Sequence, residues 1–297
     1  MHQSLIDSLI KASGEIDLAI WSETVIPYIN NSFNADLDYS LLQDHASTYD
    51  YDLISGFAEF YFYKEGDYIP DIAKEVQGNP RKKYDTHNAV LYLDNDKPNI
   101  SSERPKTYRK MKLTPFAEHF PHAETLWFMR DLVKWGVGIS GWKKGDTQFN
   151  MQIKDSLKLG TIICIESIYP DFVAGFTDKG AGFLTIITND AWYDFTPGPE
   201  QHFQIARMRA IENRRYIPRV ANTGVTGLIG ADGSEIDRIE QYKAGAAAYD
   251  IPLLATKSVF VTTRWWFGSI ITAVAFVFLF ITVGKKIQQY KSNREML

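Results

Sequence analysis

One segment near the end of the chain constrains the architecture more than any other. Residues 265–284, WWFGSIITAVAFVFLFITVG, contain no charged side chain, and Arg264 and Lys285 flank them. A helix of this length extends for about 30 Å, the thickness of the hydrocarbon core of a bilayer. Trp265 and Trp266 stand where an aromatic belt would lie. We therefore predict a transmembrane helix over 265–284. The alternative is a buried core helix, which rarely runs this long without a polar residue.

The residues after this segment predict its orientation. The tail 285–297, KKIQQYKSNREML, is basic, and basic residues next to a span favour the cytoplasmic side. The tail would then be cytoplasmic and the preceding domain periplasmic, as in a protein of the bacterial inner membrane. The start of the chain, MHQSLIDSLIKASGEIDLAIW, lacks the basic region and the long apolar core of a signal peptide. The sequence thus shows no obvious means of exporting that domain.

The rest of the chain predicts one α/β domain over 1–255 and a juxtamembrane linker over 256–264. Apolar runs that favour strands alternate with segments of helical periodicity. We expect strands at 17–21, 52–57, 88–94, 159–166 and 182–190 and two more within 217–233, and helices at 3–13, 171–179 and 199–215. The net charge of −4 gives no argument for nucleic-acid binding.

The single cysteine, Cys164, has two interpretations. Free cysteine is among the most buried residue types, so it could simply fill space in the core. Alternatively, side chains at the carboxyl ends of strands collect at one sheet edge, where Cys164 would meet Glu23 and Lys110. There an ammonium would lower the thiol pKa, and a carboxylate would take and return the proton during acyl transfer. Composition alone favours the first interpretation. The six histidines show no metal-ligand spacing.

Four ordered segments change that balance. DLAIWSETVIP contains Glu23, YRKMKLTPFAEHFP contains Lys110 and Glu118, and GTIICIESIYPD contains Cys164 and Glu166. In this order they resemble the motifs of the nitrilase superfamily, the carbon–nitrogen hydrolases with a Glu-Lys-Cys triad. The fourth segment, ITNDAWYDFTPGPEQHFQIARMRAIENRRYIPRVANTGVTGLIGADG, precedes the apolar helix and basic tail. It is similar to one branch of that superfamily, the apolipoprotein N-acyltransferases.

The resemblance implies a fold and a role for each matching residue. The fold would be a nitrilase-like α-β-β-α sandwich with a C-terminal transmembrane helix. Glu23 would be the general base, Lys110 the oxyanion stabiliser, Cys164 the nucleophile and Glu118 a supporting carboxylate. The candidate substrate-binding residues are Glu166, Ile165, Asn189 and Trp192.

The chain also departs from the family pattern. Ser22 stands where the family has proline, Ala117 where it has glycine, Lys112 where it has histidine and Ile165 where it has tyrosine. Family members carry several membrane helices and an opening strand before the part that matches. We therefore expect this domain to lack its first strand. Either the chain is an incomplete gene product, or a separate chain carries the missing membrane helices.

The reaction implied by the resemblance is N-acyl transfer. Cys164 would take an acyl chain from a phospholipid as a thioester. The α-amino group of the diacylglyceryl-cysteine that begins an apolipoprotein would then accept it. Neither a cofactor nor a metal is implied. Two alternatives stay open: a membrane-anchored amidase with water as the acceptor, and an inactive remnant or partner subunit.

Overall fold

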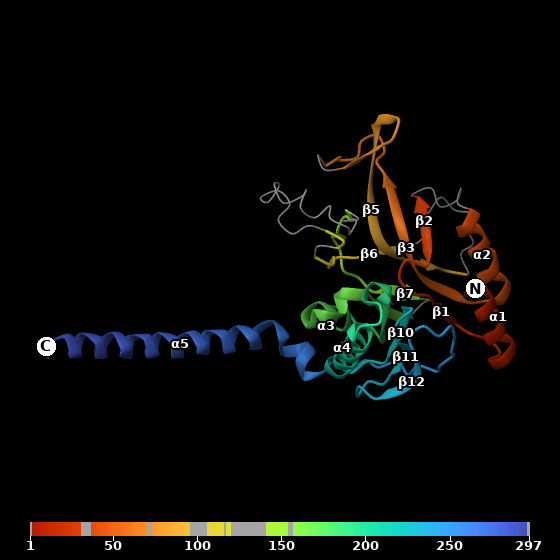
Figure 1. Cartoon of the computed structure of the whole chain (residues 1–297). Helices are drawn as coiled ribbons and strands as arrows, with labels where there is room; N and C mark the ends of the chain where they lie inside the picture. The colour runs from red at the N-terminus through yellow and green to blue at the C-terminus, as the bar shows by residue number, and fades with distance from the viewer. Residues whose placement is uncertain are drawn as a thin grey trace.

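The chain folds into four layers, helices outside and two sheets inside (Figure 1). The computed structural model describes residues 2–30, 37–70, 73–95, 106–115, 117–119, 141–153 and 157–295. Each sheet has six strands, and one apolar core joins side chains of both, such as Ile54 and Val90 from the first and Ile162 and Ile186 from the second. The predicted α-β-β-α sandwich is confirmed.

The first sheet has the order β1-β3-β5-β4, with β2 paired to β3 and β6 paired to β5. Its strands are β1 (Leu18–Ile20), β2 (Ile26–Asn30), β3 (Asp52–Phe62), β4 (Lys74–Val76), β5 (Asn79–Leu93) and β6 (Lys106–Arg109). Side chains alternate along each strand, so β5 sends Val90 to the core between the sheets and Leu91 to the outer face. There α1 (His2–Ser13) and α2 (Leu37–Tyr49) cover the sheet.

The second sheet has the order β12-β11-β10-β9-β8-β7. Its strands are β7 (Met151–Ile153), β8 (Leu157–Ile163), β9 (Phe183–Asn189), β10 (Ile217–Asn222), β11 (Thr226–Ile229) and β12 (Glu235–Ile239). The central strands β8, β9 and β10 are parallel. They are apolar on both faces because α3 (Pro170–Asp178) and α4 (Gly198–Asn213) cover the side away from the first sheet.

Most predicted elements are present, with one informative change of boundary. The strand predicted at 159–166 ends at Ile163, because Cys164 has a positive φ of 49° and begins the 3₁₀ helix η3 (Cys164–Ile168). A second such helix, η4 (Asp190–Tyr193), follows β9. The prediction missed α2 and five strands, β2, β4, β6, β7 and β12. All five strands have five residues or fewer, and β4 and β7 have only three.

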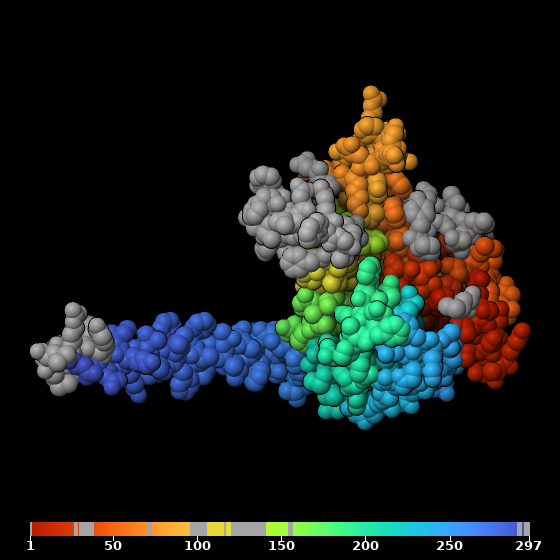
Figure 2. Space-filling model, viewed as in Figure 1, coloured from red at the N-terminus to blue at the C-terminus, as the bar shows by residue number. Residues whose placement is uncertain are grey.

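The last helix, α5 (Val259–Glu295), lies outside the sandwich (Figure 2). Its side chains from 265 to 289 are all exposed, and Val259–Gln289 is long and apolar enough to cross a membrane. A core helix would be covered by the domain, so the buried-helix alternative is wrong. Ion pairs of Asp178 with Lys257 and Arg264 tie the base of α5 to the end of α3.

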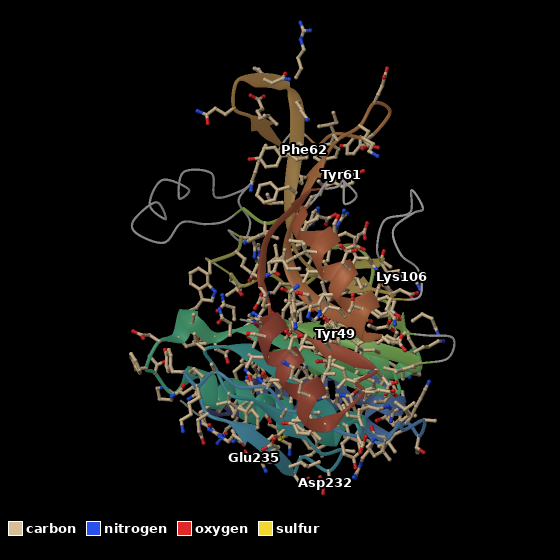
Figure 3. The ribbon with its side chains drawn as sticks, turned by 90° about the vertical axis from the view of Figure 1, so that its right-hand side faces the viewer. Tyr49, Tyr61, Phe62, Lys106, Asp232 and Glu235 are labelled. Carbon is tan, nitrogen blue, oxygen red and sulfur yellow. The ribbon has the colours of Figure 1, made fainter. Side chains whose placement is uncertain are left out.

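The hairpin of β3 and β5 extends beyond the sandwich and carries aromatic side chains (Figure 3). Phe60 stacks on Tyr84 with ring centroids 5.8 Å apart, and the Lys82 ammonium lies 4.8 Å from the Phe62 ring. The inner half of the same hairpin is buried, and its β5 strand pairs with β6, which ends directly before Lys110.

Candidate active site

Three chain segments bring the predicted site residues together, and each follows a strand. Glu23 lies in a turn after β1, Lys110 directly after β6, and Cys164 directly after β8. The Glu23 turn packs closely on β3: a Cβ added to Gly56 would lie 2.6 Å from the Cα of Glu23. Glycine at position 56 therefore allows the close approach that places Glu23.

A buried ammonium lies between two carboxylates at the centre of the site. Lys110 Nζ is 3.0 Å from Glu23 Oε1 and 2.9 Å from Glu118 Oε1, and the lysine side chain is only 1% exposed. Asn88 Nδ2 donates to the same two oxygens, at 2.6 Å from Glu23 and 2.9 Å from Glu118. Sequence analysis missed Asn88, since no motif distinguishes it within its strand.

Backbone amides hold the other oxygens of both carboxylates. The N–H of Asn189, at the end of β9, donates to Glu23 Oε2 at 2.7 Å. The N–H of Thr114 donates to Glu118 Oε2 at 2.7 Å. Both carboxylates are therefore fixed on two sides, which restricts Glu23 to one orientation.

The environment keeps Lys110 charged. Burial opposes the charge, but Glu23, Cys164 and Glu118 outweigh it and raise the pKa of Lys110. Burial likewise opposes ionisation of Glu118, yet Lys110 and the donated hydrogen bonds lower the pKa of Glu118. Buried charges that are paired and hydrogen-bonded in this way are stable together.

The thiol of Cys164 is neutral at rest. Burial, followed by the charge of Glu23, raises the pKa of Cys164 to about 12, and Lys110 and the Thr188 hydroxyl lower it less than that. The ammonium of Lys110 does lower the thiol pKa, as expected, but burial and the charge of Glu23 outweigh it. Burial dominates because Cys164 is only 8% exposed.

Comparison with protein families identifies the family of this chain. The family model of carbon–nitrogen hydrolases matches residues 2–259, nearly the whole chain before the apolar helix. The chain belongs to the carbon–nitrogen hydrolase family. Solved relatives have the same fold: a carbon–nitrogen hydrolase from Helicobacter pylori G27 has a TM-score of 0.51 at 16% identity and covers 80% of this chain and 78% of its own. Nit3 of Saccharomyces cerevisiae, a nitrilase-superfamily member, has a TM-score of 0.52 at 15% identity with the same coverage.

Curated relatives are more similar in sequence. Apolipoprotein N-acyltransferase of Chlorobaculum tepidum is 34% identical over 80% of this chain and 44% of its own length. Apolipoprotein N-acyltransferase 1 of Treponema denticola is 27% identical over 97% of this chain and 53% of its own length. The chain thus spans about half the length of the curated relatives it matches.

Glu166 connects two segments of this candidate site. Its carboxylate accepts hydrogen bonds from the Tyr108 hydroxyl at 2.9 Å and from the N–H groups of Met111 at 2.6 Å and Ile163 at 2.9 Å. Burial raises the pKa of Glu166 to about 7 although these donors favour the charged form. The side chain therefore ties η3 to the segment after β6, where Lys110 lies.

The other predicted binding residues lie in different surroundings. Ile165 packs against the core next to Cys164. The Asn189 side chain accepts from the Ala191 N–H at 3.3 Å and so caps η4, while its backbone holds Glu23. The Trp192 side chain points into solvent and is 77% exposed.

A second polar cluster lies under Cys164, and sequence analysis did not connect its members. The Arg219 guanidinium donates to Asp190 Oδ2 at 2.8 Å, and His202 Nδ1 lies 3.0 Å from Asp190 Oδ1 and 3.2 Å from Arg219 Nη2. All three side chains are buried. The sequence hint was an acidic residue directly after an apolar strand, but nothing in the spacing indicates its two partners.

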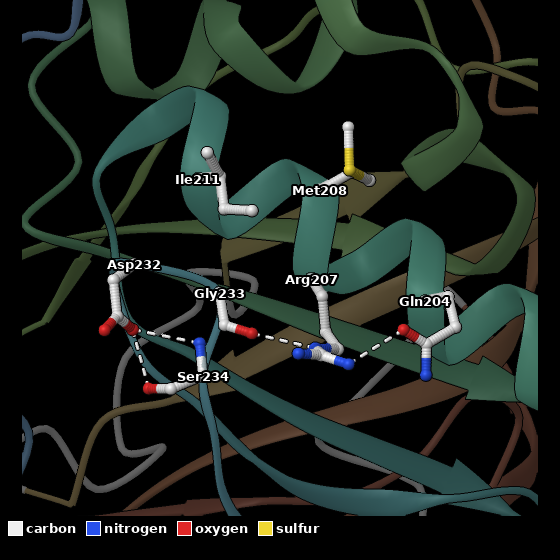
Figure 4. Close-up of a pocket in the computed structure, with 7 residues that line it drawn as sticks. All are labelled: Gln204, Arg207, Met208, Ile211, Asp232, Gly233 and Ser234. Carbon is white, nitrogen blue, oxygen red and sulfur yellow. Dashed lines mark hydrogen bonds between the residues drawn. The ribbon is translucent and has the colours of Figure 1, made fainter.

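A shallow pocket of about 460 Å³ lies elsewhere, between α4 and the turn that precedes β12 (Figure 4). The Arg207 guanidinium donates to the Gly233 carbonyl at 2.8 Å across it. None of the predicted site residues lines this pocket, so we do not assign the active site to it.

Proposed function

We propose that this chain is the catalytic part of an N-acyltransferase that moves an acyl chain from a phospholipid to the amino terminus of an apolipoprotein. One observation carries the proposal: a strand-end thiol is buried with a Glu23–Lys110 ion pair, in a domain tied to an exposed apolar helix. Such a helix places a Cys site next to lipid. Curated relatives named apolipoprotein N-acyltransferase support the same conclusion.

In the first half-reaction Cys164 becomes acylated. Glu23 accepts the thiol proton while Sγ attacks the ester carbonyl carbon of the phospholipid. The S–C bond forms, the ester C–O bond breaks, and Glu23 returns the proton to the departing glycerol oxygen. The products are a thioester on Cys164 and a lysophospholipid. A thiol that stays neutral until attack adds no third negative charge next to Glu23 and Glu118.

In the second half-reaction the acyl group moves to nitrogen. The free α-amino group of the diacylglyceryl-cysteine attacks the thioester carbon and gives a proton to Glu23. The N–C bond forms, the C–S bond breaks, and Glu23 returns that proton to the Cys164 sulfur. Each cycle thus ends with the thiol and the carboxylate in their starting states.

Both tetrahedral adducts carry a negative oxygen that needs donors. Lys110 is one, since its ammonium is fixed beside the thiol, and the backbone N–H of Ile165 is the other, directly after the nucleophile. Because the donor at position 165 is a backbone group, isoleucine serves there as well as tyrosine does.

The exposed aromatic side chains after β9 supply an apolar contact for the substrate. Trp192 and Phe195 are 77% and 82% exposed. They follow Asn189, whose N–H holds Glu23. Trp192 contacts the acyl chain in this proposal. Glu166, Ile165 and Asn189 support the shape of the site.

The helix α5 anchors this domain in the inner membrane with residues 285–297 in the cytoplasm and the domain in the periplasm. The basic side chains that follow the span motivate this orientation. Further membrane helices complete the proposed enzyme. An Asn293→Cys substitution in a Cys164→Ala background tests orientation: a membrane-impermeant maleimide added outside spheroplasts should leave position 293 unlabelled, and labelling there would contradict it.

A fluorescent phospholipid tests the chemistry. The full chain, co-expressed with the complete membrane helices of a relative, is mixed in detergent micelles with a phospholipid that carries a fluorescent acyl chain. We expect a covalent label on Cys164 that hydroxylamine removes, as it does thioesters, and transfer of the label to a diacylglyceryl-cysteine peptide.

Two variants serve as controls. Cys164→Ala should take no label, and Cys164→Ser should hold any label as an ester that resists hydroxylamine at neutral pH. Absence of label on a folded chain with a titratable thiol would refute the proposal. Release of ammonia from small amides without acyl-peptide product would favour an anchored amidase instead.

A further inference from the structure

The backbone at Cys164 is held in a conformation that residues other than glycine rarely adopt. Its φ is 49°, in the left-handed region, immediately after the extended residue Ile163. Its carbonyl accepts from the Ser167 hydroxyl at 2.8 Å and lies 3.2 Å from His202 Nε2. Two side chains outside the proposed catalytic groups therefore hold the nucleophile's own carbonyl.

These two side chains belong to a continuous buried chain of hydrogen bonds. Ser167 Oγ lies 2.8 Å from His202 Nε2, and His202 Nδ1 lies 3.0 Å from Asp190 Oδ1. Asp190 Oδ2 then accepts from Arg219 Nη2 at 2.8 Å, and Arg219 is also bonded to the Val225 carbonyl. The exposed fractions are 0% for Ser167 and Arg219, 1% for Asp190 and 4% for His202.

Counting the available hydrogens assigns a proton to one ring nitrogen of His202. Ser167 has a single hydroxyl proton and donates it to the Cys164 carbonyl. Its short contact with His202 then requires a proton on Nε2. The same N–H points toward the Cys164 carbonyl as well. Asp190 and Arg219 face the opposite ring nitrogen and hold the ring in place.

Holding this carbonyl has a consequence on the other side of the peptide bond. The described residues contain no cis peptide, so the Cys164–Ile165 peptide is trans and planar. In such a peptide the C=O and the N–H point in opposite directions. A carbonyl fixed toward Ser167 and His202 therefore aims the Ile165 N–H away from them.

We propose that Ser167 and His202, braced by Asp190 and Arg219, are positioning residues that aim the Ile165 N–H at the developing oxyanion. This inference rests on the proposed thiol chemistry and assigns how its backbone donor is held. The four side chains touch no reacting atom. They act through one peptide group, and they come from η3, α4, η4 and β10, which meet only in the folded chain.

Two reactions of the same thiol distinguish a change in the orientation of the Ile165 N–H from a general loss of folded structure. Acylation of Cys164 by a p-nitrophenyl ester passes through a tetrahedral oxyanion, whereas alkylation by iodoacetamide displaces iodide without one. In Ser167→Ala and His202→Leu we expect acylation to slow about 10- to 100-fold, since losing an oxyanion donor outright costs about 100- to 1,000-fold. Alkylation should stay within about two-fold of the wild-type rate, because no oxyanion forms.

Two further variants complete the test on the full chain in detergent. His202→Gln, whose amide nitrogen can donate near the Nε2 position, should recover much of the acylation rate. Thr177→Val removes another buried bond to α4, that of Thr177 Oγ1 to Asn213 Oδ1 at 2.8 Å, and should change neither rate.

The outcomes are distinct. A parallel fall of acylation and alkylation in Ser167→Ala and His202→Leu, or no fall in either, would overturn the inference. Failure of wild-type chain to react with phospholipid, while the p-nitrophenyl ester still acylates Cys164, would count against the proposed function and leave this inference standing.

Discussion

The buried ammonium of Lys110 gives the sharpest test of what holds the site together. Lys110→Met keeps the length of the side chain and removes its charge. The Glu23 and Glu118 carboxylates, which lie 3.0 and 2.9 Å from Nζ, would then face each other with Asn88 as their shared donor. Leaving a buried charge without its partner typically costs about 3–5 kcal/mol. We expect a loss of free energy of unfolding in that range.

A second substitution separates repulsion between charges from loss of packing. Glu118→Gln removes one of the two carboxylates, so the double variant Lys110→Met/Glu118→Gln should regain about 1–3 kcal/mol relative to Lys110→Met. It should not regain acylation of Cys164, because the donor for the oxyanion is still absent. A stability gain without an activity gain is the expected pattern.

Urea unfolding of the full chain in non-ionic detergent, followed by tryptophan fluorescence, measures these free energies. Lys257→Met is the matched control: Lys257 Nζ pairs with Asp178 Oδ1 at 2.7 Å, but the two side chains are 42% and 46% exposed. Solvent screens such a pair, and we expect a loss of about 0–1 kcal/mol. Equal losses for Lys110→Met and Lys257→Met, or no recovery in the double variant, would refute the reasoning.

Three further outcomes follow from the same contacts. Gly56→Ala should slow Cys164 acylation by displacing the turn that carries Glu23, because the new Cβ would lie 2.6 Å from backbone atoms; unchanged acylation kinetics would contradict this. Tyr108→Phe removes the hydroxyl that donates to Glu166 and should cost about 1.5–3 kcal/mol in urea unfolding. Burial disfavours the Asp190 charge, but its His202 and Arg219 contacts lower the Asp190 pKa from 3.8 to about 2. A lowered folded-state pKa stabilises the fold above pH 3.8, and about 2 kcal/mol of the free energy of unfolding is lost as the pH falls toward 2. The Asp190→Asn variant should not show this loss when its free energy of unfolding is compared between pH 5 and pH 2.5.

The sequence alone determined the features that depend on local composition. The apolar segment 265–284 was recognisable because an uncharged run of that length matches a bilayer wherever it occurs. The central strands were recognisable because strands buried on both faces are continuously apolar. The order of motifs around Glu23, Lys110 and Cys164 also indicated the sandwich and the residues that meet in it.

Only the tertiary structure decided how those residues interact. Glu23 and Lys110 are 87 positions apart, and Asn88 joins Glu23 across 65 positions. No local pattern encodes such a partner. The upward pKa shift of Cys164 and the carbonyl held by His202 likewise depend on what surrounds the thiol. Burial and charge act through space, so their balance exists only once the strands, helices and turns have come together.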